Sequence, residues 1–266
     1  MGRIARRFQL LRARGEAALA PYLMAGYPTL GATSELLYAI VQAGADLVEL
    51  GIPFSDPLAD GATLQAANQH ALAGGATLSR VLDLVASVRS TIAVPLVLMS
   101  YYNPVLRMGD GFAAQAAAAG VDGLIIPDLP VEESAPLRDA CGAVGIDLVG
   151  MVAPTSPDDR VKRIARSASG FVYCVSLKGV TGARHELSDG VRPLVERVKA
   201  ETSLPVMVGF GISTPDHVRA VTAFADGAVV GSGLLDRIDR APGAPVEAAA
   251  HLVEELKGAC RVRSST

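Results

Sequence analysis

Eight short apolar segments alternate with eight stretches of helical pattern, and this alternation constrains the fold more than any other feature of the chain. The segments are rich in Val, Ile and Leu and show little polar alternation, which is typical of strands covered on both faces of a parallel sheet. We expect strands at residues 19–25, 46–50, 95–100, 123–126, 147–151, 170–175, 205–209 and 227–230. We expect the main helices at residues 34–43, 78–88, 111–119, 132–144, 157–167, 191–200, 215–224 and 246–257.

Eight strand–helix units in a chain of 266 residues predict an α/β fold, a (β/α)8 or TIM barrel, as a single domain over residues 1–266. A doubly wound open sheet is the alternative, but the turn after the first strand, AGYPTLGAT, lacks its GxGxxG pattern. The basic segment MGRIARRFQLLRARGE predicts an extra amphipathic helix at the N-terminus. Unusually long connections follow the second and sixth strands, where we expect long loops at the end of the barrel that carries active sites.

Composition excludes several classes of partner and cofactor. Lys and Arg number 24 against 27 Asp and Glu, so the net charge is −3 and nucleic acid is not an expected partner. The three cysteines are widely spaced and the four histidines lack ligand spacing, so we expect neither a disulfide framework nor a metal site. No apolar run approaches ~18 residues, and the N-terminal segment lacks the features of a signal peptide. We therefore expect a cytoplasmic protein without membrane contact.

Glu49 is the first candidate for chemistry, at the end of the second expected strand. Strand residues alternate sides, so the apolar pair Val48 and Leu50 suits the helix layer and Glu49 faces the barrel interior with Leu47. Burial among apolar residues raises the pKa of a carboxyl, which makes it a proton donor and acceptor near neutrality. A structural glutamate paired with Lys or Arg is the alternative.

Two further acids, Asp56 and Asp60, lie in the proline-containing segment PFSDPLADG that follows. If this segment folds back over the barrel mouth, Asp60 and Glu49 face each other across a substrate in different environments, an arrangement that separates acid and base roles. Turn or helix-cap chemistry is the alternative for both aspartates. For Asp56 we favour capping or partner contact.

Glycine-rich segments follow the last three strands. KGVTGARH, from Lys178 to His185, predicts either a mobile lid or a plain flexible loop. The other two, GFGIS and GSG, follow the seventh and eighth strands, the usual phosphate site of a TIM barrel, and contain no Lys or Arg. Backbone amides and Ser232 would therefore bind the anion. Lys178 offers a rival mechanism, a Schiff base with a carbonyl substrate.

Together these segments resemble the tryptophan synthase alpha subunit family. The resemblance rests on LMAGYPT, VELGIPFSDPLADG, YYNPV, GLIIPDLP, VYCVSLKGVTGAR, VGFGIST and VVGSGLL, which run in family order over residues 23–235. It implies retro-aldol cleavage of indole-3-glycerol phosphate to indole and glyceraldehyde 3-phosphate. In this family no metal or organic cofactor is needed, because protonation of indole C3 creates the electron sink.

The resemblance also assigns roles. Glu49 would protonate indole C3 and help to remove the glycerol hydroxyl proton, and Asp60 would accept a hydrogen bond or proton from the indole N–H. The remaining substrate residues would be Tyr22, Met99, Ile126, Tyr173 and Thr181. The phosphate residues would be Gly182, Phe210, Gly211, Gly231 and Ser232.

The same resemblance implies a beta subunit that uses pyridoxal phosphate and consumes the indole, in an alpha2beta2 assembly. Asp56, Pro57 and Asn103 are the expected contacts with it, and this chain itself would hold no cofactor. Three alternatives stay open: a stand-alone lyase, a Schiff-base aldolase using Lys178, and a catalytically idle subunit that only activates its partner.

Overall fold

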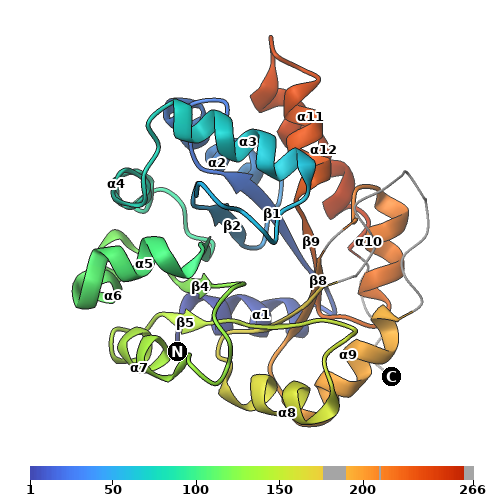
Figure 1. Cartoon of the computed structure of the whole chain (residues 1–266). Coiled ribbons are helices and arrows are strands. Elements are labelled where there is room, and N and C mark those ends of the chain that lie inside the picture. The colour runs from blue at the N-terminus through green and yellow to red at the C-terminus, as the bar shows by residue number, and fades with distance from the viewer. Residues whose placement is uncertain (176–189, 210, 261–266) are drawn as a thin grey trace.

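The strands of the chain form one parallel ring, as seen in a computed structural model that describes residues 1–175, 190–209 and 211–260 (Figure 1). The order around the sheet is β5-β4-β3-β2-β1-β9-β8-β7-β6. The strands are β1 (Ala18–Met24), β2 (Val48–Gly51), β3 (Leu96–Met99), β4 (Gly123–Ile125), β5 (Asp147–Leu148), β6 (Gly150–Val152), β7 (Val172–Val175), β8 (Val206–Gly209) and β9 (Gly227–Val230). The predicted TIM barrel is confirmed.

The ring closes through the segment that the sequence predicts as one strand at residues 147–151. The structure divides this segment into β5, which pairs with β4 through Leu124 and Leu148, and β6, which pairs with β7 through Gly150 and Val172. The amide of Val149, between the two pieces, still donates to the carbonyl of Leu124 at 2.9 Å. The nine strands of the sheet therefore correspond to eight strands of a barrel.

Helices surround the ring, and each expected main helix is present, the one at residues 78–88 with its predicted ends and the others with shifted ends. Three further helices, α3, α5 and α11, were not predicted, and α3 occupies part of the long connection after β2. The helices are α1 (Arg3–Ala13), α2 (Leu30–Gln42), α3 (Ala62–Ala73), α4 (Leu78–Val88), α5 (Tyr102–Met108), α6 (Phe112–Ala119), α7 (Ala135–Ala143), α8 (Asp158–Ser167), α9 (Val191–Glu201), α10 (Pro215–Thr222), α11 (Ser232–Asp239) and α12 (Pro245–Lys257), with a 3-10 turn η1 (Gly109–Gly111). Within the described residues no single helix has the length and apolarity to cross a membrane, although α3 and α4, bent by 92°, meet both criteria as a pair.

Two apolar layers follow from the alternation of side chains along each strand. The larger cluster lies between the strands and the outer helices and contains Val48 and Leu50. The smaller one fills the interior of the ring and contains Leu47, so the predicted alternation in β2 is confirmed. The interior cluster comprises Ile4, Phe8, Leu11, Ala18, Ala20, Leu47, Val97, Ile125, Val149, Phe171, Tyr173, Met207 and Val229.

A repeated side-chain clamp fixes the strands at the end of the ring where they begin. Asp46, just before β2, donates its amide to the carbonyl of Leu19 and accepts the Leu19 amide on its carboxylate at 2.7 Å. The same reciprocal pairing joins Asp122 to Leu96 at 2.9 Å, Ser169 to Leu148 at 2.9 Å and Asp226 to Val206 at 2.9 Å. Every second strand of the barrel thus holds the strand before it in register.

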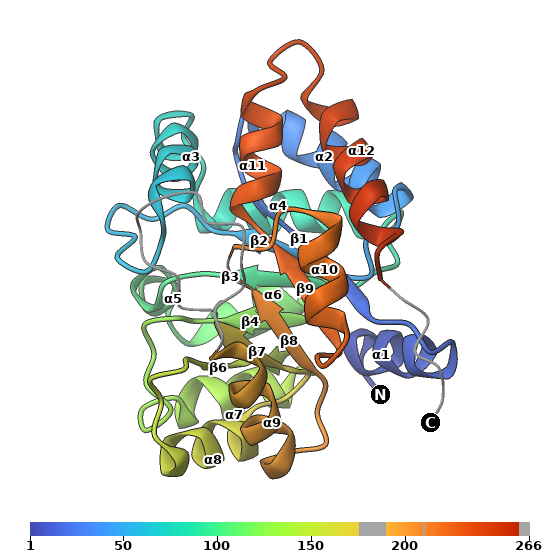
Figure 2. The same cartoon turned by 90° about the vertical axis from the view of Figure 1, so that its right-hand side faces the viewer.

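Helix α1 closes this base of the ring. Figure 2 shows α1 at the end opposite the connections that follow the strands, and its apolar residues Ile4, Phe8 and Leu11 join the interior cluster. Two ion pairs attach it to the clamps, Arg7 to Asp46 at 2.6 Å and Arg3 to Asp122 at 2.9 Å. The predicted N-terminal amphipathic helix is confirmed.

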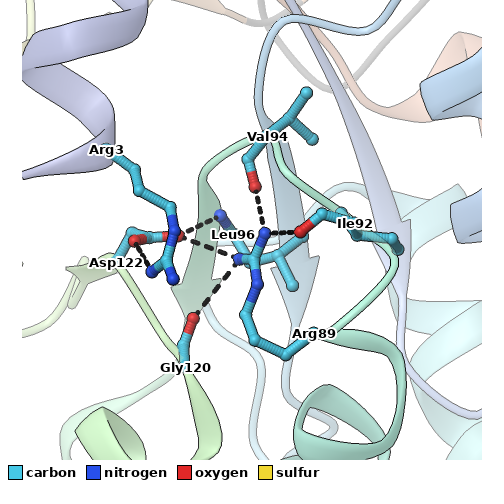
Figure 3. A network of polar contacts seen from close by, with 7 residues as sticks. All are labelled: Arg3, Arg89, Ile92, Val94, Leu96, Gly120 and Asp122. Atoms are coloured by element: carbon cyan, nitrogen blue, oxygen red, sulfur yellow. Dashed lines mark hydrogen bonds and ion pairs between the residues drawn. The ribbon is translucent and has the colours of Figure 1, made fainter.

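Figure 3 shows the Asp122 clamp in detail. The carboxylate lies between Arg3 of α1 and Arg89 at the end of α4, and it also accepts the amide of Leu96. Arg89 in turn donates to the carbonyl of Gly120 and to two carbonyls of the turn before β3, those of Ile92 and Val94. One buried carboxylate therefore links α1, α4, β3 and β4.

Candidate active site

Glu49 is buried inside the mouth of the ring. It lies on β2 in register with Tyr22 of β1 and Val97 of β3, and only 1% of its surface is exposed. Burial raises its pKa to about 8, and its Oε1 atom has no hydrogen-bond partner among the described residues. The expected elevation of the pKa is confirmed, and in the described structure this carboxyl has no Lys or Arg partner. At neutral pH Glu49 therefore carries a proton.

Two buried tyrosines flank Glu49, and each fills the space above a glycine of a neighbouring strand. A Cβ atom on Gly51 would lie 2.0 Å from the hydroxyl oxygen of Tyr22, and one on Gly209 would lie 1.9 Å from that of Tyr173. Burial, followed by the charge of nearby carboxylates that include Glu49, raises the pKa of both phenols well above the ordinary value. Both hydroxyls therefore stay protonated next to the acid.

The segment between β2 and α3 brings Asp60 back to the mouth. Its first half is clamped by Asn68 of α3, which accepts the Phe54 amide and donates to the Phe54 carbonyl, both at 2.8 Å. The ring of Phe54 stacks on Tyr101, whose hydroxyl accepts the Ala59 amide at 2.8 Å. These contacts fix the position of Asp60 relative to the end of β3.

Asp60 has an environment different from that of Glu49. Partial burial raises its pKa to about 6, while a hydrogen bond from Tyr101 works in the opposite direction. At pH 7 Asp60 is therefore mostly ionised and Glu49 mostly protonated. The charges of both carboxyls raise the pKa of Tyr22, so both acids lie near that phenol. Such a pair, with separated pKa values, is what acid–base chemistry requires.

A cavity of about 690 Å³ opens beside Asp60. Asp60 and Ile126 line it, as do Met151 on β6 and Val175 at the end of β7. Its size falls within the usual range for small-molecule sites. In the part of the chain that the structure describes, Asp60 borders this cavity, whereas Glu49 and the predicted residue Met99 do not. Met99 is partly buried against both apolar layers.

The two glycine-rich turns after β8 and β9 lie against each other. A Cβ atom on Gly233 would be 2.8 Å from the Cβ of Ser213, and Gly211 has a φ of +77°, which side chains rarely adopt. Gly231 and Ser232 begin helix α11, where the amides of Leu234 and Leu235 donate to the Gly231 carbonyl. The amides before them have no helical partner, so this end of α11 suits an anion.

Several predicted residues lie outside the described part of the chain: Lys178, Thr181, Gly182 and Phe210. The predicted partner contacts Asp56 and Asn103 are exposed and Pro57 is half-buried. Asp56 and Pro57 lie between β2 and α3, and Asn103 lies in α5. Among the described residues, no group of three His, Cys, Asp or Glu side chains could hold a metal ion.

The sequence interpretation missed the residues that hold Asp60, namely Tyr101, Phe54 and Asn68. Tyr101 belongs to the YYNPV motif, in which only Asn103 has a predicted role, as a partner contact. A phenol directly after the third strand was the available signal, because residues at the carboxyl ends of barrel strands meet at the mouth. Asn68 gave no signal, since it lies in a helix that was not predicted.

A closed parallel ring with two carboxyls of different pKa at its mouth defines a TIM-barrel enzyme of acid–base chemistry. Residues 8–262 match the family model described as "Tryptophan synthase alpha chain". The chain belongs to the tryptophan synthase alpha chain family, and it is thereby an enzyme of the indole-3-glycerol phosphate cleavage step.

Individual relatives agree with the family match. The chain is 53% identical to a tryptophan synthase alpha chain of Roseiflexus sp. (strain RS-1), over 97% of this chain and 100% of the relative. It is 51% identical to a tryptophan synthase alpha chain of Chloroflexus aggregans, over 97% of this chain and 98% of the relative. Among solved structures, Mycobacterium tuberculosis tryptophan synthase superposes with a TM-score of 0.91 at 38% identity, covering 98% of each chain. The tryptophan synthase subunit alpha from Legionella pneumophila str. Paris superposes with a TM-score of 0.90 at 36% identity, also covering 98% of each chain.

Proposed function

We propose that Glu49 and Asp60 perform the proton transfers of indole-3-glycerol phosphate cleavage in this chain. The observation that carries the proposal is the difference between their pKa values, about 8 and about 6. At neutral pH one acid then holds a proton to give and the other a charge that accepts a hydrogen bond. General acid–base catalysis of this kind contributes about 10²–10⁴-fold to the rate.

The steps balance without an added reactant. Glu49 gives its proton to C3 of the indole ring, which leaves a cationic indolenine whose N–H is stabilised by the carboxylate of Asp60. The carboxylate of Glu49 then takes the proton of the hydroxyl on the carbon bonded to C3. The bond between that carbon and C3 breaks, its electron pair restores the neutral indole, and the carbon becomes the aldehyde of glyceraldehyde 3-phosphate. Glu49 ends protonated, as it began.

The remaining substrate contacts in this proposal are those that the family resemblance implies. Tyr22, Met99 and Ile126 line the indole site, and Tyr173 and Thr181 also contact the substrate. The phosphate is bound by backbone amides of Gly182, Phe210, Gly211 and Gly231 and by Ser232. The position of Gly231 and Ser232 at the N-terminus of α11 supports the last two.

The chain acts in the cytoplasm as one domain, with no cofactor or metal of its own, beside a pyridoxal phosphate-dependent beta subunit in an alpha2beta2 assembly. Asp56, Pro57 and Asn103 form the contact. Their neighbour Leu58 supports this assignment, because 92% of this apolar side chain is exposed.

The test is an indole-release assay on the isolated chain, with and without a tryptophan synthase beta subunit. We expect Glu49→Gln to bind substrate and release no indole, and the exposed Glu35→Gln to behave like the wild type. Turnover by Glu49→Gln would contradict the proposal.

Two outcomes identify the rival functions. Absence of indole from the wild type, with or without the partner, would identify a subunit that only activates. Trapping of a covalent adduct by borohydride would identify a Schiff-base aldolase.

A further inference from the structure

Tyr22 spans the distance between the two ends of the proposed substrate. Its Cβ lies on the side of the phosphate turn, where a Cβ atom on Gly231 would be 3.8 Å away. Its hydroxyl lies on the side of the catalytic acid, above Gly51, two residues after Glu49 on β2. The three-carbon chain of a substrate whose phosphate binds at α11 and whose indole ring is protonated by Glu49 therefore runs along this phenol.

The hydroxyl of Tyr22 lacks a good hydrogen-bond partner. The side chain is 4% exposed, and among the described residues its contact is the Met24 sulfur at 4.0 Å. A thioether is a weak acceptor, and a buried tyrosine hydroxyl usually has a strong one. Oε1 of Glu49 is also unpartnered in the described structure. A buried carboxyl oxygen without a partner and a buried phenol with only a weak one thus lie on neighbouring strands, which indicates that a polar ligand completes the site.

The substrate has one polar group that the proposed mechanism leaves unassigned. The hydroxyl on the carbon bonded to indole C3 gives its proton to Glu49, and the phosphate is held at α11. The hydroxyl on the middle carbon takes no part in bond breaking and stays on the aldehyde product. It lies between the two ends of the substrate, as the Tyr22 phenol lies between Gly231 and Glu49.

We propose that the Tyr22 hydroxyl donates a hydrogen bond to the middle-carbon hydroxyl of the substrate, which makes Tyr22 a specificity-determining residue for a hydroxylated three-carbon chain. The inference rests on the proposed function, because it takes the substrate orientation from Glu49 and the phosphate turn. Burial and the nearby carboxylates keep the phenol protonated, so it is a donor throughout the working pH range.

The test combines Tyr22→Phe with a substrate that lacks only the middle-carbon hydroxyl. We expect Tyr22→Phe to lower kcat/KM for indole-3-glycerol phosphate by about threefold to tenfold, the loss of one neutral hydrogen bond. On the deoxy substrate, wild type and Tyr22→Phe should be equal. Tyr38→Phe is the matched control, since Tyr38 lies on the outer helix α2 and its hydroxyl contacts Thr91.

Each other outcome overturns the inference. An equal loss of kcat/KM on both substrates would mean that the phenol acts through packing. If the basic limb of the pH profile also moved, the phenol would act through Glu49. No loss on either would mean that the hydroxyl makes no contact. Absence of indole release by the wild type would overturn the proposed function and this inference together, and only in that case would Tyr22→Phe and wild type be inactive alike.

Discussion

Tyr101 and Asp60 are hydrogen-bonded to each other across the mouth of the barrel, although one follows β3 and the other precedes α3. The same phenol accepts the Ala59 amide, so a single side chain fixes both the backbone and the carboxylate of the segment. The bond favours the ionised form of Asp60 and opposes the effect of burial on its pKa. Tyr101 therefore acts as a positioning residue for Asp60.

We expect a bell-shaped pH dependence of kcat/KM for indole release. Activity should rise as Asp60 ionises, with a limb at about pH 6, and fall as Glu49 loses its proton, with a limb at about pH 8. Initial rates between pH 5 and pH 9 at low substrate concentration check this. A profile that rises through pH 8 would show that Glu49 works as an ionised base in the free enzyme.

Tyr101→Phe should move the acidic limb of that profile. Without the hydrogen bond that lowers it, the pKa of Asp60 rises above about 6, so the loss of kcat/KM is greatest below pH 6 and small at pH 8. A shift of one pKa unit corresponds to about a tenfold loss at low pH. An unchanged acidic limb, with a uniform loss at all pH values, would show that Tyr101 only packs.

Glu49→Gln should become more stable than the wild type as the pH rises. The folded-state pKa of about 8 exceeds the ordinary 4.5, so the folded protein holds this proton more tightly. The wild type therefore loses stability between these two pH values, and the glutamine does not. We expect equal melting temperatures at pH 4 and a gain on the order of 5 °C at pH 9. Glu35→Gln, on the exposed face of α2, should show no such trend.

Asp122→Ala should destabilise the protein without altering the chemistry of the folded fraction. Asp122 and Arg89 are 6% and 11% exposed, so the substitution leaves a buried guanidinium without its counter-ion and the Leu96 amide without its acceptor. Removal of one partner of such a pair costs about 3 kcal/mol. Asp139→Ala is the control, since its carboxylate is 72% exposed and pairs only with Arg138 in the described structure. Urea unfolding gives the free energy of unfolding of both variants. Equal losses for Asp122→Ala and Asp139→Ala would contradict a role for burial.

Gly51→Ala should lower activity by displacing the Tyr22 phenol. The added Cβ would lie 2.0 Å from the phenol oxygen and 2.6 Å from the ring, so the ring must move away from Gly51. Gly142→Ala offers a matched control, because a Cβ there meets no atom within 4 Å and α7 gains about 0.5–1 kcal/mol in stability. Indole release measures the effect on activity, and the melting temperature measures the effect on stability. Full activity of Gly51→Ala would show that the position of the phenol is not critical.

The ring and the orientation of Glu49 could be predicted because both follow from local patterns. Apolar runs identify strands covered on both faces, and the alternation of Leu47, Val48 and Leu50 places Glu49 on the inside. The division of residues 147–152 into two strands could not be predicted, since it arises from pairing with different neighbours on each side. Helix α3 was missed because its sequence, ATLQAANQHALA, has small and polar residues in place of a clear apolar stripe.

The sequence predicts individual site residues, but it does not predict the contacts between them. Burial explains the raised pKa of Glu49, and burial follows from strand alternation. The contacts of Tyr101 with Asp60 and of Asn68 with Phe54 join segments that are remote in the sequence, and only the closed barrel brings them together. The fit of Tyr22 over Gly51 is likewise a consequence of two neighbouring strands in register.

The four clamps formed by Asp46, Asp122, Ser169 and Asp226 join the strands of the ring in four pairs at the base. Because register is set at the end remote from the chemistry, a change in the length of a connection at the mouth has no route by which to slide a strand past its neighbour. An exchange of these connections can therefore alter substrate choice while the scaffold beneath is inherited intact.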